Sequence, residues 1–135
     1  MSHYTNAHRA AQAYRGAAVT VSPLKAVVLL LDGAILSLQK TIDAAENKRF
    51  EESHGHLVRA TTILRGLSYH LSAEKGGALA DRLFRTYNSL IVSSLASFGR
   101  PDAAARYRKI IGALTDLRNS WKFVEETAGS RKSAI

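Results

Sequence analysis

Glu51 and His54 form a residue pair whose types and spacing suit metal binding. On a helix, a Glu-x-x-His pair places a carboxylate and an imidazole on one face, as in the di-metal sites of helical bundles. Such a site needs a second pair and further inward carboxylates, and the chain has no second pair. His54 and His56 are two positions apart and cannot face each other on a helix. Solvated histidines are therefore the preferred interpretation, and we expect no metal and no cofactor.

Other catalytic patterns are missing from the sequence. The chain has no cysteine, which excludes a thiol nucleophile, a disulfide framework and Cys-based metal sites. No Gly-x-Ser-x-Gly sequence occurs, so the turn that presents a serine nucleophile in many hydrolases is absent. The paired glycines Gly76 and Gly77 lack the Lys-Ser/Thr ending of a phosphate-binding loop. We therefore expect a binding protein and not an enzyme.

Four stretches carry apolar residues every three or four positions, which is the spacing of an amphipathic helix. The positions expected in the core include Leu31, Leu38, Phe50, Leu57, Leu64, Phe84, Tyr87, Leu95, Phe98, Tyr107, Leu114 and Val124. The first stretch begins at Ser22 and Pro23, where serine can cap a helix and proline suits its first turn, and extends to about residue 47. The others cover about residues 49–71, 78–98 and 102–124, with a loop at 72–77 that contains Gly76 and Gly77. Gly99 is expected to end the third helix, because glycine tolerates a positive φ. Helices of similar length joined by short loops predict an all-α, antiparallel up-down four-helix bundle over residues 22–127.

The remaining segments are a leader, residues 1–21, expected to be partly flexible, and a tail, residues 128–135, expected to be flexible. The longest apolar run is too short to cross a bilayer, and the leader lacks the apolar segment of a signal peptide. These features predict a soluble cytoplasmic protein of one domain without membrane insertion. The net charge of +8 permits an anionic partner, but Lys and Arg are spread over the chain, which favours a solvated surface over nucleic-acid binding. A basic helical adaptor that binds nucleic acid or another anionic partner is the alternative function.

Apolar residues also occur outside the core stripes of the predicted helices. Five of them lie off these stripes or at their margins: Leu29, Leu36, Ile63, Val92 and Phe123. One interpretation is a wide core or a dimer contact. The other is that apolar grooves between helices receive an amphipathic or extended segment of a partner.

Several short motifs follow one another in a specific order along residues 11–124. They are Ala13-Tyr14, Ser22-Pro23, LLLDGAI at 29–35, SAEKGGALADRLFRTYNSLI at 72–91 and LTDLRNSW at 114–121. In this order and spacing the sequence resembles the flagellin-specific export chaperones, the FliS family. The positions that match the motifs of the family are Ser22, Pro23, Asp32, Gly33, Gly76, Gly77, Tyr87 and Trp121.

This resemblance implies a non-enzymatic chaperone of the bacterial cytosol. Such proteins bind the disordered C-terminal segment of flagellin, prevent its premature polymerisation and deliver it to the flagellar export gate. The five apolar residues named above, together with Tyr14 and Val19 of the leader, are the expected flagellin contacts. The leader is either a cap over an apolar groove when cargo is absent or a frayed terminus, and the free protein could form a homodimer.

Overall fold

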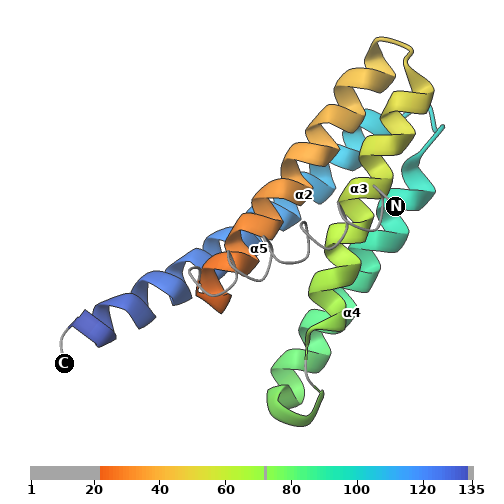
Figure 1. Cartoon of the computed structure of the whole chain (residues 1–135). Helices are drawn as coiled ribbons and strands as arrows, with labels where there is room; N and C mark the ends of the chain where they lie inside the picture. The colour runs from red at the N-terminus through yellow and green to blue at the C-terminus, as the bar shows by residue number, and fades with distance from the viewer. Residues whose placement is uncertain (1–21, 72, 134–135) are drawn as a thin grey trace, which may run out of the picture.

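The computed structural model describes residues 22–71 and 73–133, which form four α-helices. They are α2 (Pro23–Glu46), α3 (Phe50–Tyr69), α4 (Ala73–Ser97) and α5 (Ala103–Ser133). Short connections make consecutive helices antiparallel, and α2 packs against α3 and α5, α3 against α4, and α4 against α5 (Figure 1). The predicted all-α up-down bundle is confirmed. Tyr14 and Val19 lie outside the described residues.

The helix ends follow from local chemistry. Ser22 caps α2, because its Oγ accepts a hydrogen bond from the backbone amide of Lys25 at 3.2 Å, and Pro23 is the first helical residue. Gly99 has a φ of +82°, a left-handed conformation that terminates α4 and that glycine adopts without strain. Both features agree with the sequence prediction.

Two predicted boundaries are corrected. The segment predicted as a loop at 72–77 is largely helical, since α4 already begins at Ala73. Gly77 interrupts this helix with a φ of 55°, and a Cβ at Gly76 would collide with the Cβ of Ala80, so both positions suit glycine. The predicted tail, 128–135, is helical through Ser133, and the boundary at 127 therefore falls inside α5.

The four helices lie together at one end of the molecule and spread apart at the other (Figure 1). We call the first the closed end; it holds the α2–α3 and α4–α5 connections. There, Ser53 Oγ donates a hydrogen bond to the Thr41 carbonyl at 2.8 Å, and Arg108 pairs with Glu46 at 3.1 Å. At the opposite, open end, the pair α2–α5 diverges from the pair α3–α4 (Figure 1).

The core lies between the inward stripes of the four helices. Its fully buried large side chains include Leu31, Leu38, Leu57, Leu64, Tyr87, Tyr107 and Leu114, all at predicted core positions. Other predicted core positions are instead exposed: Phe50, Phe84, Leu95, Phe98 and Val124. Helical spacing alone does not reveal how far a neighbouring helix extends over the margin of a stripe, so these five assignments were wrong.

Candidate binding surfaces

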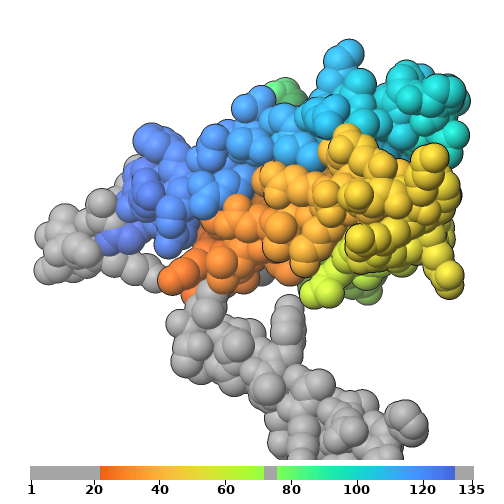
Figure 2. Space-filling view, turned by 90° about the horizontal axis from the view of Figure 1, so that it is seen from above, coloured from red at the N-terminus to blue at the C-terminus, as the bar shows by residue number. Residues whose placement is uncertain are grey.

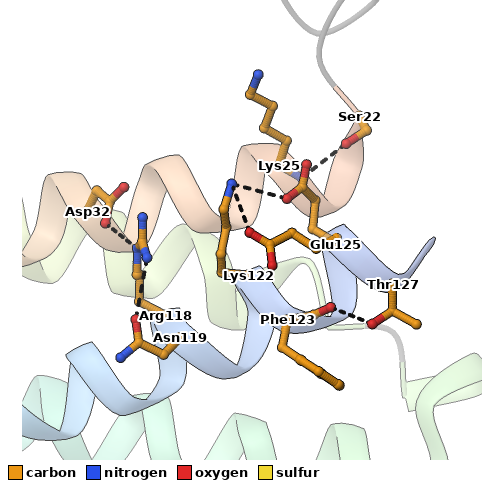
Figure 3. Close-up of polar contacts among 10 residues, drawn as sticks. Ser22, Lys25, Asp32, Arg118, Asn119, Lys122, Phe123, Glu125 and Thr127 are labelled. Carbon is orange, nitrogen blue, oxygen red and sulfur yellow. Dashed lines mark hydrogen bonds and ion pairs between the residues drawn. The ribbon is translucent and has the colours of Figure 1, made fainter. Parts of the chain in front are cut away.

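The motif residues Asp32 and Tyr87 each join their helix to α5. Arg118 Nε on α5 donates to Asp32 Oδ1 at 2.8 Å, and Figure 3 shows these two side chains directed toward each other. This ion pair connects the LLLDGAI and LTDLRNSW segments. Because both side chains are partly exposed, we expect it to contribute only ~0.2–1 kcal/mol and to act mainly by aligning the two helices.

A second link joins α4 to α5 inside the bundle. Trp121 Nε1 donates a hydrogen bond to the Tyr87 hydroxyl at 3.1 Å, and Tyr87 is buried. Burial raises the pKa of Tyr87, and the hydrogen bond from Trp121 acts in the opposite direction more weakly. These motif residues therefore hold α4 against α5, Tyr87 from within the core and Trp121 from a partly buried position.

Gly33 lies where α2 and α3 approach each other. A Cβ built on Gly33 would lie 3.4 Å from Cδ1 of Ile63, which is ordinary van der Waals contact. Glycine thus leaves room for the Ile63 side chain, but a methyl group would also fit.

Three of the expected contact residues meet around Gly33. Leu29 lies four residues before Gly33 and Leu36 three residues after it, so all three lie on one face of α2. Leu29 and Leu36 are 51% and 50% exposed, whereas Ile63 packs partly against the core. We call Leu29, Gly33, Leu36 and Ile63 the α2–α3 surface. Figure 2 shows α2 itself between α5 and α3.

Val92 lies elsewhere, on the edge of α4 that faces α3. Two contacts cross this seam: Asn88 Nδ2 donates to Ser68 Oγ at 3.2 Å, and the rings of His54 and Phe98 pack edge to face at 5.2 Å. Val92 follows Asn88 by four residues and therefore shares its face. The exposed apolar side chains along this seam, which we call the α3–α4 surface, are Val58, Tyr69, Phe84, Val92, Leu95 and Phe98.

Sequence reasoning missed most of the α3–α4 surface. Phe84, Leu95 and Phe98 had been assigned to the core, and Val58 and Tyr69 had no role. The available signal was the width of the α4 stripe, which carries more large apolar residues than one face of a helix can bury.

Phe123 stands apart from both surfaces. It is 69% exposed on α5, and Figure 3 shows its side chain directed away from the ion pairs of Arg118 and Lys122. The structure does not bring Phe123 together with Leu29, Leu36 or Val92.

Two pockets mark the ends of the bundle. The closed-end pocket, of about 220 Å³, is lined mostly by apolar residues of α2, α3, α5 and the α4–α5 connection, and by Tyr107, whose buried hydroxyl has no partner among the described residues. Burial also raises the pKa of Tyr107. The open-end pocket, of about 230 Å³, lies between the α3–α4 hairpin and α5 and is lined by His70, Leu71, Gly76, Leu79, Ala80, Leu83 and Trp121.

The residues weighed for metal binding are on the surface. Glu51 and His54 are both exposed, and the His54 ring packs against Phe98. Within residues 22–71 and 73–133 no group of three or more His, Cys, Asp or Glu side chains is placed to hold a metal ion. The described helices also include none that is long and apolar enough to span a membrane.

Comparison with known proteins agrees with the motifs and the fold. The family model described as "Flagellar protein FliS" matches residues 6–128. The "Flagellar secretion chaperone FliS" of Salmonella typhimurium is 29% identical over 118 residues, which cover 87% of this chain and 87% of the relative. Because the family match spans all four helices except the last turns of α5, the chain belongs to the FliS family of flagellar proteins.

Proposed function

We propose that this protein is a cytoplasmic flagellar export chaperone that binds the disordered C-terminal segment of flagellin. Binding would prevent premature polymerisation and keep the cargo ready for delivery to the export gate. Family membership and the name of the Salmonella relative support the chaperone role. The observation that carries the cargo assignment is the exposure of large apolar side chains along two seams between helices.

The two seams have the geometry that an amphipathic partner requires. A groove between two packed helices accepts the apolar face of a third, with contacts spaced by three or four residues. Soluble monomers rarely leave extended apolar patches uncovered. Since α3 contributes to both surfaces, a disordered segment that wraps around the bundle can cover both.

Wrapping also keeps the complex reversible. A disordered segment loses conformational freedom when it binds, which costs ~2–5 kcal/mol or more of the interaction free energy. A chaperone must release its cargo at the export apparatus, so a large interface with a large ordering cost suits this role.

A calorimetric titration with a peptide of the flagellin C-terminal segment tests the proposal. We expect binding with a negative heat-capacity change, because apolar surface is buried, and delayed polymerisation of full-length flagellin at equimolar chaperone. Leu36→Asp should weaken binding, whereas Gln39→Asp, at an exposed position of the same helix outside the α2–α3 surface, should not. Absence of binding by the unaltered chain would refute the proposal.

The same apolar side chains would be covered in a homodimer, so self-association and cargo binding compete in this proposal. Analytical ultracentrifugation should give a mass that rises with protein concentration and that becomes a 1:1 complex when flagellin is added. A titration with duplex DNA in the same buffer tests the alternative partner. Tight DNA binding that weakens steeply with salt would favour the basic adaptor instead.

A further inference from the structure

The exposed face of α2 has a regular order of charged and apolar residues. Lys25, Leu29, Gly33, Leu36 and Lys40 follow one another at intervals of four, four, three and four residues. Residues at these intervals form a single row along a helix. The apolar part of the α2–α3 surface therefore has a lysine at each end.

A third cation borders the same surface from α3. Arg59 lies four residues before Ile63, so the two share one edge of α3. This edge faces α2, because Ile63 Cδ1 lies 3.4 Å from the position that a Cβ on Gly33 would take. Lys25, Lys40 and Arg59 thus surround the apolar residues on three sides.

These three cations have no ion pair within the described residues, although many other charges do. Asp32, the only acid between Lys25 and Lys40, is already paired with Arg118, and α3 has no acidic residue after Glu52. All three cationic side chains are exposed. The surface therefore carries positive charge that the bundle itself does not neutralise.

Lys25 also opposes the local field of its own helix. The N-terminus of a helix carries partial positive charge and favours acidic residues. The first turn of α2 nevertheless holds Lys25 and no acid. Figure 3 shows the Lys25 side chain extended away from α5. An anionic group bound beside this turn would offset both the charge of Lys25 and the partial positive charge of the helix N-terminus.

We propose that the segment bound on the α2–α3 surface is an amphipathic helix whose apolar stripe has acidic residues at both ends. This inference rests on the proposed function and specifies the chemistry of the cargo there. Lys40 lies fifteen residues after Lys25, a span of about 22 Å at 1.5 Å per residue. Acidic side chains about four helical turns apart would meet both lysines, and one about a turn from the Lys40 end would meet Arg59, because α3 runs antiparallel to α2.

This arrangement gives part of the +8 net charge a role in cargo recognition. Exposed ion pairs contribute little affinity individually, but they accelerate encounter and favour one register of a sliding helix. Leucine contacts repeat with the helical period and do not distinguish neighbouring registers. Charges at the two ends of the row distinguish these registers.

The test compares two double variants with the same change in net charge. The row variant, Lys25→Glu with Lys40→Glu, reverses the charge at both ends of the α2 row. The control variant, Arg82→Glu with Lys109→Glu, reverses two exposed cations on α4 and α5 that likewise have no ion pair among the described residues. Calorimetry with the flagellin C-terminal peptide at low salt should give about tenfold weaker binding for the row variant and less than twofold for the control. A peptide with its Asp and Glu replaced by Lys should bind the row variant better than the unaltered chain.

Equal weakening by the two double variants would overturn the inference and leave the proposed function intact. If the unaltered chain fails to bind flagellin, the proposed function fails by itself. A designed amphipathic peptide with Glu residues four turns apart then tests the surface separately. Its binding to the unaltered chain but not to the row variant would support the inference, and its failure to bind would overturn it.

Discussion

The α2–α3 and α3–α4 surfaces share a helix but differ in chemistry. The α2–α3 surface exposes two leucines beside a glycine and is bordered by three cations that form no ion pair with the described residues. The α3–α4 surface exposes more apolar side chains, three of them aromatic, and a hydrogen bond between Asn88 and Ser68 crosses its seam. Under the proposed function this difference implies a division of roles, in which the α3–α4 surface would supply most of the apolar contact area and the α2–α3 surface the charge that selects partner and register.

The largest expected effect comes from placing carboxylates on the α3–α4 surface. Val92→Asp with Leu95→Asp should weaken flagellin binding about 100-fold, since each replaces an exposed apolar contact by a charge that the cargo would desolvate. Leu29→Asp with Leu36→Asp should weaken flagellin binding about tenfold, because the neighbouring cations partly offset the new charges. Calorimetric titration measures both. A larger loss on the α2–α3 side would reverse the assigned roles.

Raising the salt concentration should change the flagellin affinity several-fold when binding depends on one surface and little when it depends on the other. In the variant that carries Val92→Asp and Leu95→Asp, residual binding depends on the cationic α2–α3 surface and should weaken as ionic strength rises. In the variant that carries Leu29→Asp and Leu36→Asp, residual binding depends on apolar burial and should change little. Titrations at low and high salt provide the measurement, and identical salt dependence would remove the distinction.

Gly33→Ala should change stability modestly and binding hardly at all. Alanine favours a helix interior by ~1 kcal/mol over glycine, and the added methyl would meet Ile63 at an ordinary contact distance. We expect a small rise in the urea midpoint with unchanged flagellin affinity. Gly33→Leu is the informative partner, since its larger side chain would displace Ile63 or cover the α2–α3 surface and weaken binding. A destabilised Gly33→Ala variant would show that the contact is already tight.

The smallest effect concerns the tyrosines behind the two surfaces. Tyr87→Phe removes the hydroxyl that accepts the hydrogen bond of Trp121 Nε1 and joins α4 to α5. It should lower the free energy of unfolding by ~1 kcal/mol. Tyr107→Phe removes a hydroxyl without a described partner, so stability should stay the same or rise slightly. Urea unfolding of both variants measures the difference. A marked loss for Tyr107→Phe would mean that a bound water completes the closed-end pocket.

The stability of the protein at alkaline pH provides a second measurement of the effect of the same tyrosines. Burial raises the pKa of Tyr87 and Tyr107 in the folded protein above the unfolded value of 10.0, so the folded state favours the neutral phenols. Their contribution is fully present below pH 10 and is lost as the pH rises through the folded pKa values. Thermal unfolding should therefore show stability falling above about pH 10, with a smaller fall in Tyr87→Phe. If stability falls with pH in Tyr87→Phe as it does in the unaltered chain, Tyr87 does not contribute to the fall.

The sequence predicted local features where neighbouring residues decide them. Ser22 and Pro23 begin α2, and Gly99 ends α4, because capping and backbone conformation depend on chemistry within a few positions. The motif pair Tyr87 and Trp121 was identified without its geometry, since the hydrogen bond joins helices that are distant in the chain. The predicted break at the paired glycines is confirmed at Gly77, but the chain from Ala73 up to it is helical and not a loop.

The apolar period determined from the sequence alone that four helices form and antiparallel neighbours follow from their short connections. Only the tertiary structure decided which apolar residues remain uncovered, because exposure depends on how far adjacent helices extend and where they diverge. Leu29, Leu36 and Ile63 meet, whereas Val92 and Phe123 lie elsewhere, although all five looked alike as marginal residues in the sequence. A helical period records the angle of a side chain around its own axis and contains no information on the distance to the next helix.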